Sequence, residues 1–125
     1  MLDKNPDLTF IQFALNDAFC GCPSERFRGN VLSIIDNIRN RTASEILLLT
    51  SVALDNAQDI RLVDKFYESL KDISENKGVP IARVHEYWQK RISEGTLFHT
   101  LVQADRVHPT VEGYRLMAEA IMEVL

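Results

Sequence analysis

Short apolar runs alternate along this chain with segments of helical periodicity, and this alternation narrows the folds open to it. Three runs are typical of buried strands, the last one weakened by a proline, and they cover residues 8–15, 45–52 and 79–84. Three amphipathic segments follow them in turn, at residues 26–40, 58–77 and 110–125. Strands that alternate with helices predict a parallel sheet with helices on both faces. We therefore expect one α/β domain of three layers, αβα, over residues 1–125.

Local signals mark the boundaries of these elements. Residues 17–29 contain Cys, Gly, Pro and Ser and indicate a loop, and residues 86–101 are expected to be partly helical. Gly78 follows Lys77 as a C-cap signal, and Thr110 is a favoured N-cap for the last helix. Ligands of open α/β sheets bind at the carboxyl ends of strands, so the loops after the first run and before the last helix are the places to search for a site.

Composition excludes several classes of function. Hydrophobic residues make up 46% and charged residues 26% of the chain, as in ordinary globular proteins. There are 14 basic and 18 acidic residues and no basic run, which predicts that the protein does not bind nucleic acid. No apolar stretch approaches the roughly 20 residues that span a bilayer, so we expect no membrane partner. Residues 1–7 lack the apolar core of a signal peptide, from which we expect a cytoplasmic protein.

The two cysteines, Cys20 and Cys22, do not define a site. They are too few for a disulfide framework, and no third or fourth ligand lies at zinc-site spacing. We expect reduced loop cysteines, with metal binding or redox chemistry as the alternative. No cofactor and no metal are implied.

The segment that enters the last helix contains the candidate catalytic residues. Asp105 and His108 lie three residues apart, a spacing that lets one turn place the carboxylate beside the imidazole. A serine hydrolase needs such a pair, because the histidine accepts the proton of the nucleophile and the carboxylate fixes its tautomer. Pro109 stiffens the backbone directly after the histidine. On its own the pair is a weak signal, since it is equally suited to organising a helix start.

A longer string around this pair resembles a known family. Residues 105–118 read Asp-x-x-His-Pro-x-x-x-Gly-Tyr-x-x-Met-Ala and look like the last sequence block of the SGNH/GDSL serine hydrolases. Residues 4–17, a strand that ends in Asn16-Asp17, are similar to that family's third block, where a strand ends in Gly-x-Asn-Asp. The resemblance implies a flavodoxin-like fold, a catalytic role for His108 and Asp105, and an oxyanion-binding role for Asn16. Asp17 is expected to be structural, holding the loop.

The chain departs from the family pattern in three ways. Ala14 stands where the third block has glycine. The Gly-Asp-Ser block that carries the nucleophile and the second block, whose glycine N–H joins the oxyanion hole, have no counterpart in the 125 residues. The resemblance thus implies a domain without its N-terminal βα units and without a nucleophile. Ser51, at the end of a strand run, is the least unsuitable substitute among the serines, none of which lies in a nucleophile motif.

The resemblance implies hydrolysis of a carboxylic ester through an acyl-serine intermediate, on a small acyl ester such as an acetylated sugar or a lipid. Because the nucleophile is absent, we expect this chain alone to be inactive, and whether it is an enzyme by itself stays open. One alternative is a non-catalytic binding or interaction module derived from the same fold. A second is an unrelated flavodoxin-like binding domain, in which Asn16 and His108 would not meet at one edge of the sheet.

Two further expectations concern packing. In the family's strand order, 2-1-3-4-5, the run at residues 8–15 is central and pairs with the absent first strand, so its edge should be covered by a second copy of the chain or by a partner chain. His85 and His99 have no partner pattern and are interpreted as structural or solvent-facing. Tyr87 and Trp88 are interpreted as core or interface residues, with an acyl pocket as the alternative.

Overall fold

The computed structural model describes residues 2–125, and its centre is a parallel sheet. Within these residues the sheet has three strands in the order β1-β2-β3, namely β1 (Leu8–Ile11), β2 (Glu45–Leu49) and β3 (Ile81–Ala82). The helices are α1 (Leu15–Phe19), α2 (Ser24–Arg41), α3 (Ala57–Lys77), α4 (Val84–Ser93) and α5 (Val111–Met122). Short 3₁₀ turns span Leu2–Lys4 and Phe98–Thr100.

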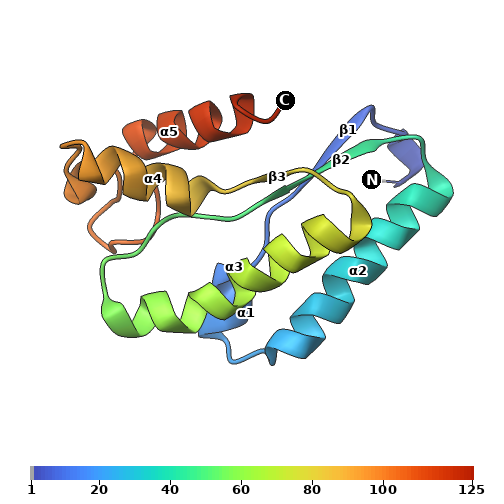
Figure 1. Cartoon of the computed structure of the whole chain (residues 1–125), viewed down its shortest axis with the longest axis horizontal. Helices are drawn as coiled ribbons and strands as arrows, with labels where there is room; N and C mark the ends of the chain where they lie inside the picture. Colours follow the sequence, from blue (N-terminus) through green and yellow to red (C-terminus); the bar gives the residue numbers. More distant parts are fainter. Residues whose placement is uncertain (1) are drawn as a thin grey trace.

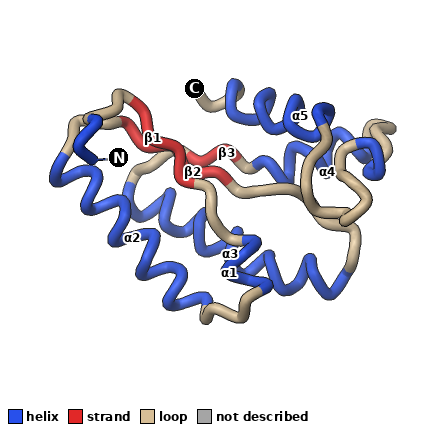
Figure 2. The backbone as a smooth tube through the Cα atoms, turned by 180° about the vertical axis from the view of Figure 1, so that it is seen from behind, coloured by secondary structure: helices blue, strands red, loops and turns tan. Residues whose placement is uncertain are grey.

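The elements form three layers. The first three helices lie on one side of the sheet, while α4 and α5 lie on the other (Figure 1; Figure 2 shows the reverse side). The prediction of a three-layer α/β fold with a parallel sheet is confirmed. Because parallel strands end at the same edge, the loops after β1 and β2 open on the same side of the molecule.

Several boundaries differ from the sequence prediction. The strand predicted for residues 8–15 ends at Ile11, because the backbone turns at Ala14 and Leu15 then begins α1. The predicted loop at residues 17–29 therefore contains part of α1 and the first turns of α2. Pro80 has no N–H to donate, and the third strand shortens to Ile81–Ala82. Both predicted caps are confirmed: Gly78 is left-handed with φ of 62°, and the Thr110 side chain accepts a bond from the N–H of Gly113.

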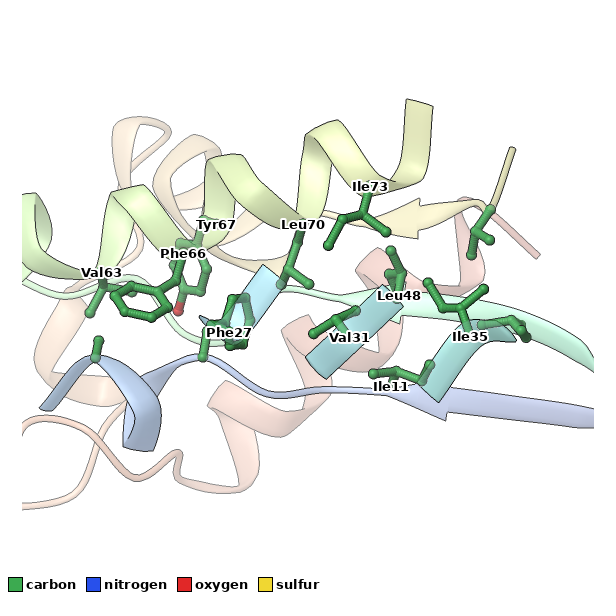
Figure 3. Close-up of a cluster of buried hydrophobic side chains, with 14 of the residues drawn as sticks. Ile11, Phe27, Val31, Ile35, Leu48, Val63, Phe66, Tyr67, Leu70 and Ile73 are labelled. Atoms are coloured by element: carbon green, nitrogen blue, oxygen red, sulfur yellow. The ribbon is translucent and has the colours of Figure 1, made fainter. Parts of the chain in front are cut away.

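The main core lies between the sheet and the pair α2 and α3. Val31 and Ile35 of α2 and Leu70 of α3 face Leu48 of β2 and are almost completely buried (Figure 3). Phe27 and Phe66 pack edge to face with centroids 5.1 Å apart. Each large apolar side chain removed from water in this way contributes about 1.5–3 kcal/mol, so this layer anchors β1 and β2 against the helices.

The second core lies on the opposite side of the sheet. Leu47 and Leu49 of β2 pack with Ile121 of α5. Trp88 of α4 is completely buried against Leu116 of α5, so it is a core residue, and the interpretation of Trp88 as packing is confirmed. Tyr87 is half-buried and donates its hydroxyl to Glu119. None of the helices within residues 2–125 is both long and apolar enough to cross a bilayer.

His85 is a buried histidine that joins the end of β2 to α4. Its Nδ1 lies 2.8 Å from Oγ1 of Thr50, and its ring lies against Tyr67 with centroids 4.3 Å apart. Burial, with a smaller contribution from the nearby Arg83 charge, lowers the pKa of His85 from 6.5 to about 4. The folded state therefore holds this imidazole neutral where the unfolded chain would protonate it.

We predict that acid destabilises the fold through His85. Between about pH 6.5 and 4 the unfolded chain binds a proton at this residue that the folded chain does not, so stability falls as pH falls through that window. The loss should reach about 2 kcal/mol at about pH 4.5, measured by urea unfolding against neutral pH. His85→Asn, which keeps a polar atom near Thr50, should remove most of this dependence. His99→Asn, at an exposed histidine, should leave it intact, and equal pH profiles for the two variants would contradict the assignment.

Candidate active site

The site is a cleft of about 410 Å³ at the carboxyl end of the sheet. Asn16 and Phe19 of α1 form one side, and Ser51 lies in the loop that follows β2. Asp105 and His108 come from the loop before α5. A second hollow of about 190 Å³ continues from the cleft along residues 12–17. Two sequence regions about ninety positions apart thus share one cleft, as the resemblance implied.

A tight loop holds Asp105 and His108. Val102 and Pro109 form an antiparallel bridge at its base, and the Gln103 N–H donates to the carbonyl of His108 at 2.8 Å. The Gln103 side chain also donates to the Pro109 carbonyl, at 3.1 Å. The Thr110 hydroxyl adds a bond to the Thr100 carbonyl at 2.7 Å, just before α5 begins. The ends of the loop are therefore fixed by its own backbone.

The Asp105 carboxylate organises the turn of this loop. One oxygen, Oδ1, accepts from the N–H groups of Val107 at 3.0 Å and His108 at 2.9 Å. The other, Oδ2, contacts His108 Nδ1, which confirms the expected approach of the two side chains. The Val107 N–H, followed by the His108 ring and its N–H, lowers the pKa of Asp105 from 3.8 to about 2. The carboxylate is thus ionised at neutral pH, and His108 keeps Nε2 as the nitrogen for proton transfer.

Asn16 sits in the first turn of α1, at the cleft, and is exposed. Its position depends on Ala14, whose carbonyl accepts the first helical bond, from the Ala18 N–H at 2.8 Å. The backbone of Asp17 accepts from the Cys22 N–H at 2.9 Å and so fixes the end of α1. An amide at this place can donate to a developing negative charge in the cleft.

Ala14 has a backbone conformation that suits glycine. Its φ is 146° and its ψ is −50°, a region that residues with a Cβ avoid. The glycine of the family's third block falls at this position, so the chain keeps the glycine-type turn although it carries alanine. The strain is of order 1–3 kcal/mol, and it is located directly beside Asn16.

We predict that Ala14→Gly stabilises the protein. Relief of the strained φ outweighs the extra entropy that glycine brings to the unfolded chain, for a net gain of about 1 kcal/mol. The melting temperature should rise by about 4 °C in differential scanning calorimetry. Ala18→Gly, within helix α1, is the matched control and should lower it. A loss of stability at both positions would mean that Ala14 is not strained.

Gly113 explains the Gly-Tyr pair of the motif. A Cβ on this residue would lie 2.2 Å from the Leu101 carbonyl oxygen, 3.0 Å from Pro109 and 3.1 Å from Trp88. Glycine therefore lets α5 approach the base of the His108 loop. The sequence motif contains this glycine, but the need for glycine comes from a close contact between segments that only the fold brings together.

Sequence reasoning missed part of the cleft. Gln12 follows β1 and donates to the Thr50 carbonyl at 3.2 Å and approaches the sulfur of Met117 at 3.6 Å, so it links the sheet to α5 under the site. Tyr114 and Met117 line the cleft from α5. The Gly-Tyr-x-x-Met string contained both residues, but the sequence analysis gave neither of them a place in the site.

Side chains that could bind a metal ion are dispersed within residues 2–125. No group of three or more His, Cys, Asp or Glu side chains in that range is arranged to hold a metal ion. Cys20 is exposed, Cys22 is half-buried, and both are free thiols.

The parallel sheet, the cleft at its carboxyl edge and the aspartate–histidine pair define a three-layer α/β protein with a candidate catalytic site. The model of the GDSL-like lipase/acylhydrolase family matches residues 1–116, and the chain belongs to this family. This assignment excludes an unrelated flavodoxin-like domain. A search of curated proteins found no match.

Solved structures share the fold at low sequence identity. An acetylxylan esterase, Axe2 from Geobacillus stearothermophilus, has a TM-score of 0.85 and 20% identity and covers 98% of this chain. LAE5, an α/β hydrolase enzyme from the metagenome of Lake Arreo, Spain, has a TM-score of 0.84 and 17% identity, again covering 98% of this chain. This chain spans 61% of the length of each of these proteins. Catalytic mutants of Axe2 replace a serine near the start of that enzyme, an aspartate, and a histidine three positions after the aspartate.

Proposed function

We propose that this chain is the histidine-bearing part of a carboxylic ester hydrolase that works through an acyl-serine intermediate. The observation that carries the proposal is the Asp105–His108 pair, which shares one cleft with Asn16 in a member of the GDSL-like family. The spacing of the pair equals that of the aspartate and histidine replaced in the Axe2 catalytic mutants.

The residues divide the chemistry between them. His108 takes the proton of the serine hydroxyl through Nε2 while the serine oxygen bonds to the carbonyl carbon, and it then gives that proton to the leaving alcohol. Asp105, ionised and bonded to Nδ1, holds the tautomer and stabilises the imidazolium. Asn16 donates to the oxyanion of the tetrahedral intermediate. A water molecule then hydrolyses the acyl-serine with His108 again acting as base.

The substrate we propose is a small acyl ester. Phe19, Tyr114 and Met117 give the cleft an apolar wall that suits an acyl group or the face of a sugar ring. Axe2 acts on acetylated xylan, which makes an acetylated sugar the first substrate to test, with lipid esters second.

The nucleophile is the missing part of this mechanism. The 125 residues contain no Gly-Asp-Ser turn, and Ser51, which lines the cleft, lies in no nucleophile motif. We propose that the serine belongs to a segment that pairs with the free edge of β1. Within the described residues β1 is hydrogen-bonded to β2 alone, and its other edge ends beside the cleft.

The faces of β1 favour the same partner. Thr9 and Ile11 are buried under the helices on one side, whereas Leu8 and Phe10 on the other side are 39% and 48% exposed. Phe10 pairs in register with Leu47, which α5 covers completely. On the face that α5 occupies, the sheet is therefore covered over β2 but exposed over β1, and a further helix beside α5 would fit there.

The handedness of crossovers predicts the connection of that helix. The steps from β1 through α2 to β2 and from β2 through α3 to β3 put their helices on one face of the sheet. These two crossovers run from β1 toward β3. A right-handed crossover whose helix lies on the opposite face must run in the reverse direction, away from β1. The proposed strand beside β1 should thus connect, through that helix, to a further strand on its outer side. The direction in which successive strands are added to the sheet then reverses between the proposed strand and β1, at the edge where the cleft lies.

We predict that the chain alone does not hydrolyse p-nitrophenyl acetate faster than its His108→Ala variant. Preceding it with the N-terminal segment of Axe2 that it does not cover should produce turnover. In that chimera His108→Ala or the grafted Ser→Ala should cost about 10⁶-fold in kcat, and Asn16→Ala about 10²–10³-fold.

Asn37→Ala, on the exposed surface of α2, is the control and should have no effect. Turnover by the chain alone that needs Ser51 would relocate the nucleophile. A cooperatively folded chimera that binds ester without hydrolysing it would favour a non-catalytic module of this fold.

We also predict that the bare edge makes the chain associate. An apolar strand with unpaired N–H and C=O groups is a template for pairing with another chain. Light scattering at micromolar concentration should show dimers or larger species, and Phe10→Lys should return the protein to monomer. Leu97→Lys, at an exposed leucine outside β1, is the control and should change nothing. A stable monomer with β1 unpaired would contradict the prediction.

A further inference from the structure

Arg106 lies between the two residues of the Asp105–His108 pair and has an unusual backbone. Its φ is 63°, in the left-handed region that residues with a Cβ rarely adopt. Its N–H donates to the Gln103 carbonyl at 2.9 Å, which closes the turn. Such a conformation persists where surrounding contacts hold it, so the side chain of Arg106 is the next feature to consider.

The Arg106 side chain reaches out of its own loop to a different one. The guanidinium pairs with the carboxylate of Asp55, which lies between β2 and α3. It also lies over the ring of Phe98, with Cζ 5.9 Å from the ring centroid. The arginine thus has a charged partner on one side and an aromatic partner on the other.

The loop that carries Asp55 is fixed on both sides of that residue. Asn56, next in sequence, caps α3 by accepting from the N–H groups of Gln58 at 2.8 Å and Asp59 at 3.2 Å. On the side of β2, the Val52 carbonyl accepts a hydrogen bond from the hydroxyl of Tyr67 at 2.9 Å. Asp55 is therefore a firm anchor for a side chain that arrives from elsewhere.

Both loops contribute to the cleft, one through Ser51 and Val52 and the other through Asp105 and His108. The geometry points to Arg106 as a positioning residue: its clasp on Asp55 and Phe98 holds the tip of the His108 loop at a fixed place over the cleft. Local bonds close the base of that loop, but the clasp ties its tip to a second element. The meaning of this role for catalysis rests on the proposed function, whereas the clasp itself can be tested without turnover.

The test is amide hydrogen exchange by NMR at Val107 and His108, together with the imidazole ¹⁵N shifts of His108, which report its tautomer. Arg106→Gln, which loses an ion pair and a cation–π contact, should speed exchange of the two amides about tenfold. Asp55→Asn, which loses the ion pair alone, should speed it by a smaller factor. Each should also move the His108 shifts toward a mixture of tautomers. The double variant should be no worse than Arg106→Gln, because the ion pair that Asp55→Asn removes is already lost in that variant.

Arg106→Lys retains the ion pair and should restore most of the protection. Arg115→Gln is the matched control, since this exposed arginine pairs with Glu112 and Glu119 on its own helix. Unchanged exchange and shifts in both single variants, or additive effects in the double variant, would overturn the clasp. A fall in melting temperature with no change at His108 would make Arg106 a structural residue and overturn the positioning role.

Discussion

The parallel pairing of β1 with β2 is the constraint on which the site depends. It places the carboxyl ends of both strands at one edge, so the segments that follow them, with Asn16 and Ser51, must open on the same side. The His108 loop reaches this edge by a different route, because α5 packs on the sheet through Ile121 and carries the loop at its N-terminus. The sheet is therefore what brings Asn16 and His108 into one cleft.

The sequence was sufficient to predict the layers, the cleft that Asn16 and His108 share and the contact of Asp105 with His108, for identifiable reasons. Strand and helix periods reflect burial, which a sheet covered on both faces imposes directly on the residues. The Asp105–His108 contact spans three residues and is formed by a turn that Asp105 itself organises, so it is nearly independent of distant structure. Local features of this kind can be predicted from a single sequence.

The features that sequence reasoning missed depend on distant contacts or on backbone angles. The apolar run continues to residue 15, so the sequence gives no sign that β1 ends at Ile11. The turn at Ala14 has a positive φ that the conformational preferences of alanine would not predict. Gln12 lies within the predicted strand run, and its bonds to Thr50 and toward Met117 exist only in the assembled fold. The partnership of Arg106 with Asp55 joins loops about fifty residues apart and leaves no periodic trace.

The two halves of the cleft are therefore organised in different ways, and this bears on the proposed serine-bearing segment. The His108 half is closed by short-range bonds and by the tight packing of Gly113 against Leu101, so its geometry is set within this chain. The Asn16 half follows a strand whose outer edge and one face are open, beside a strained residue. A serine-bearing strand that pairs with β1 would support the second half and leave the first unchanged. The partner's contribution to the site would then be structural as well as chemical, because it would fix the oxyanion side of the cleft at the same time as it delivers the nucleophile.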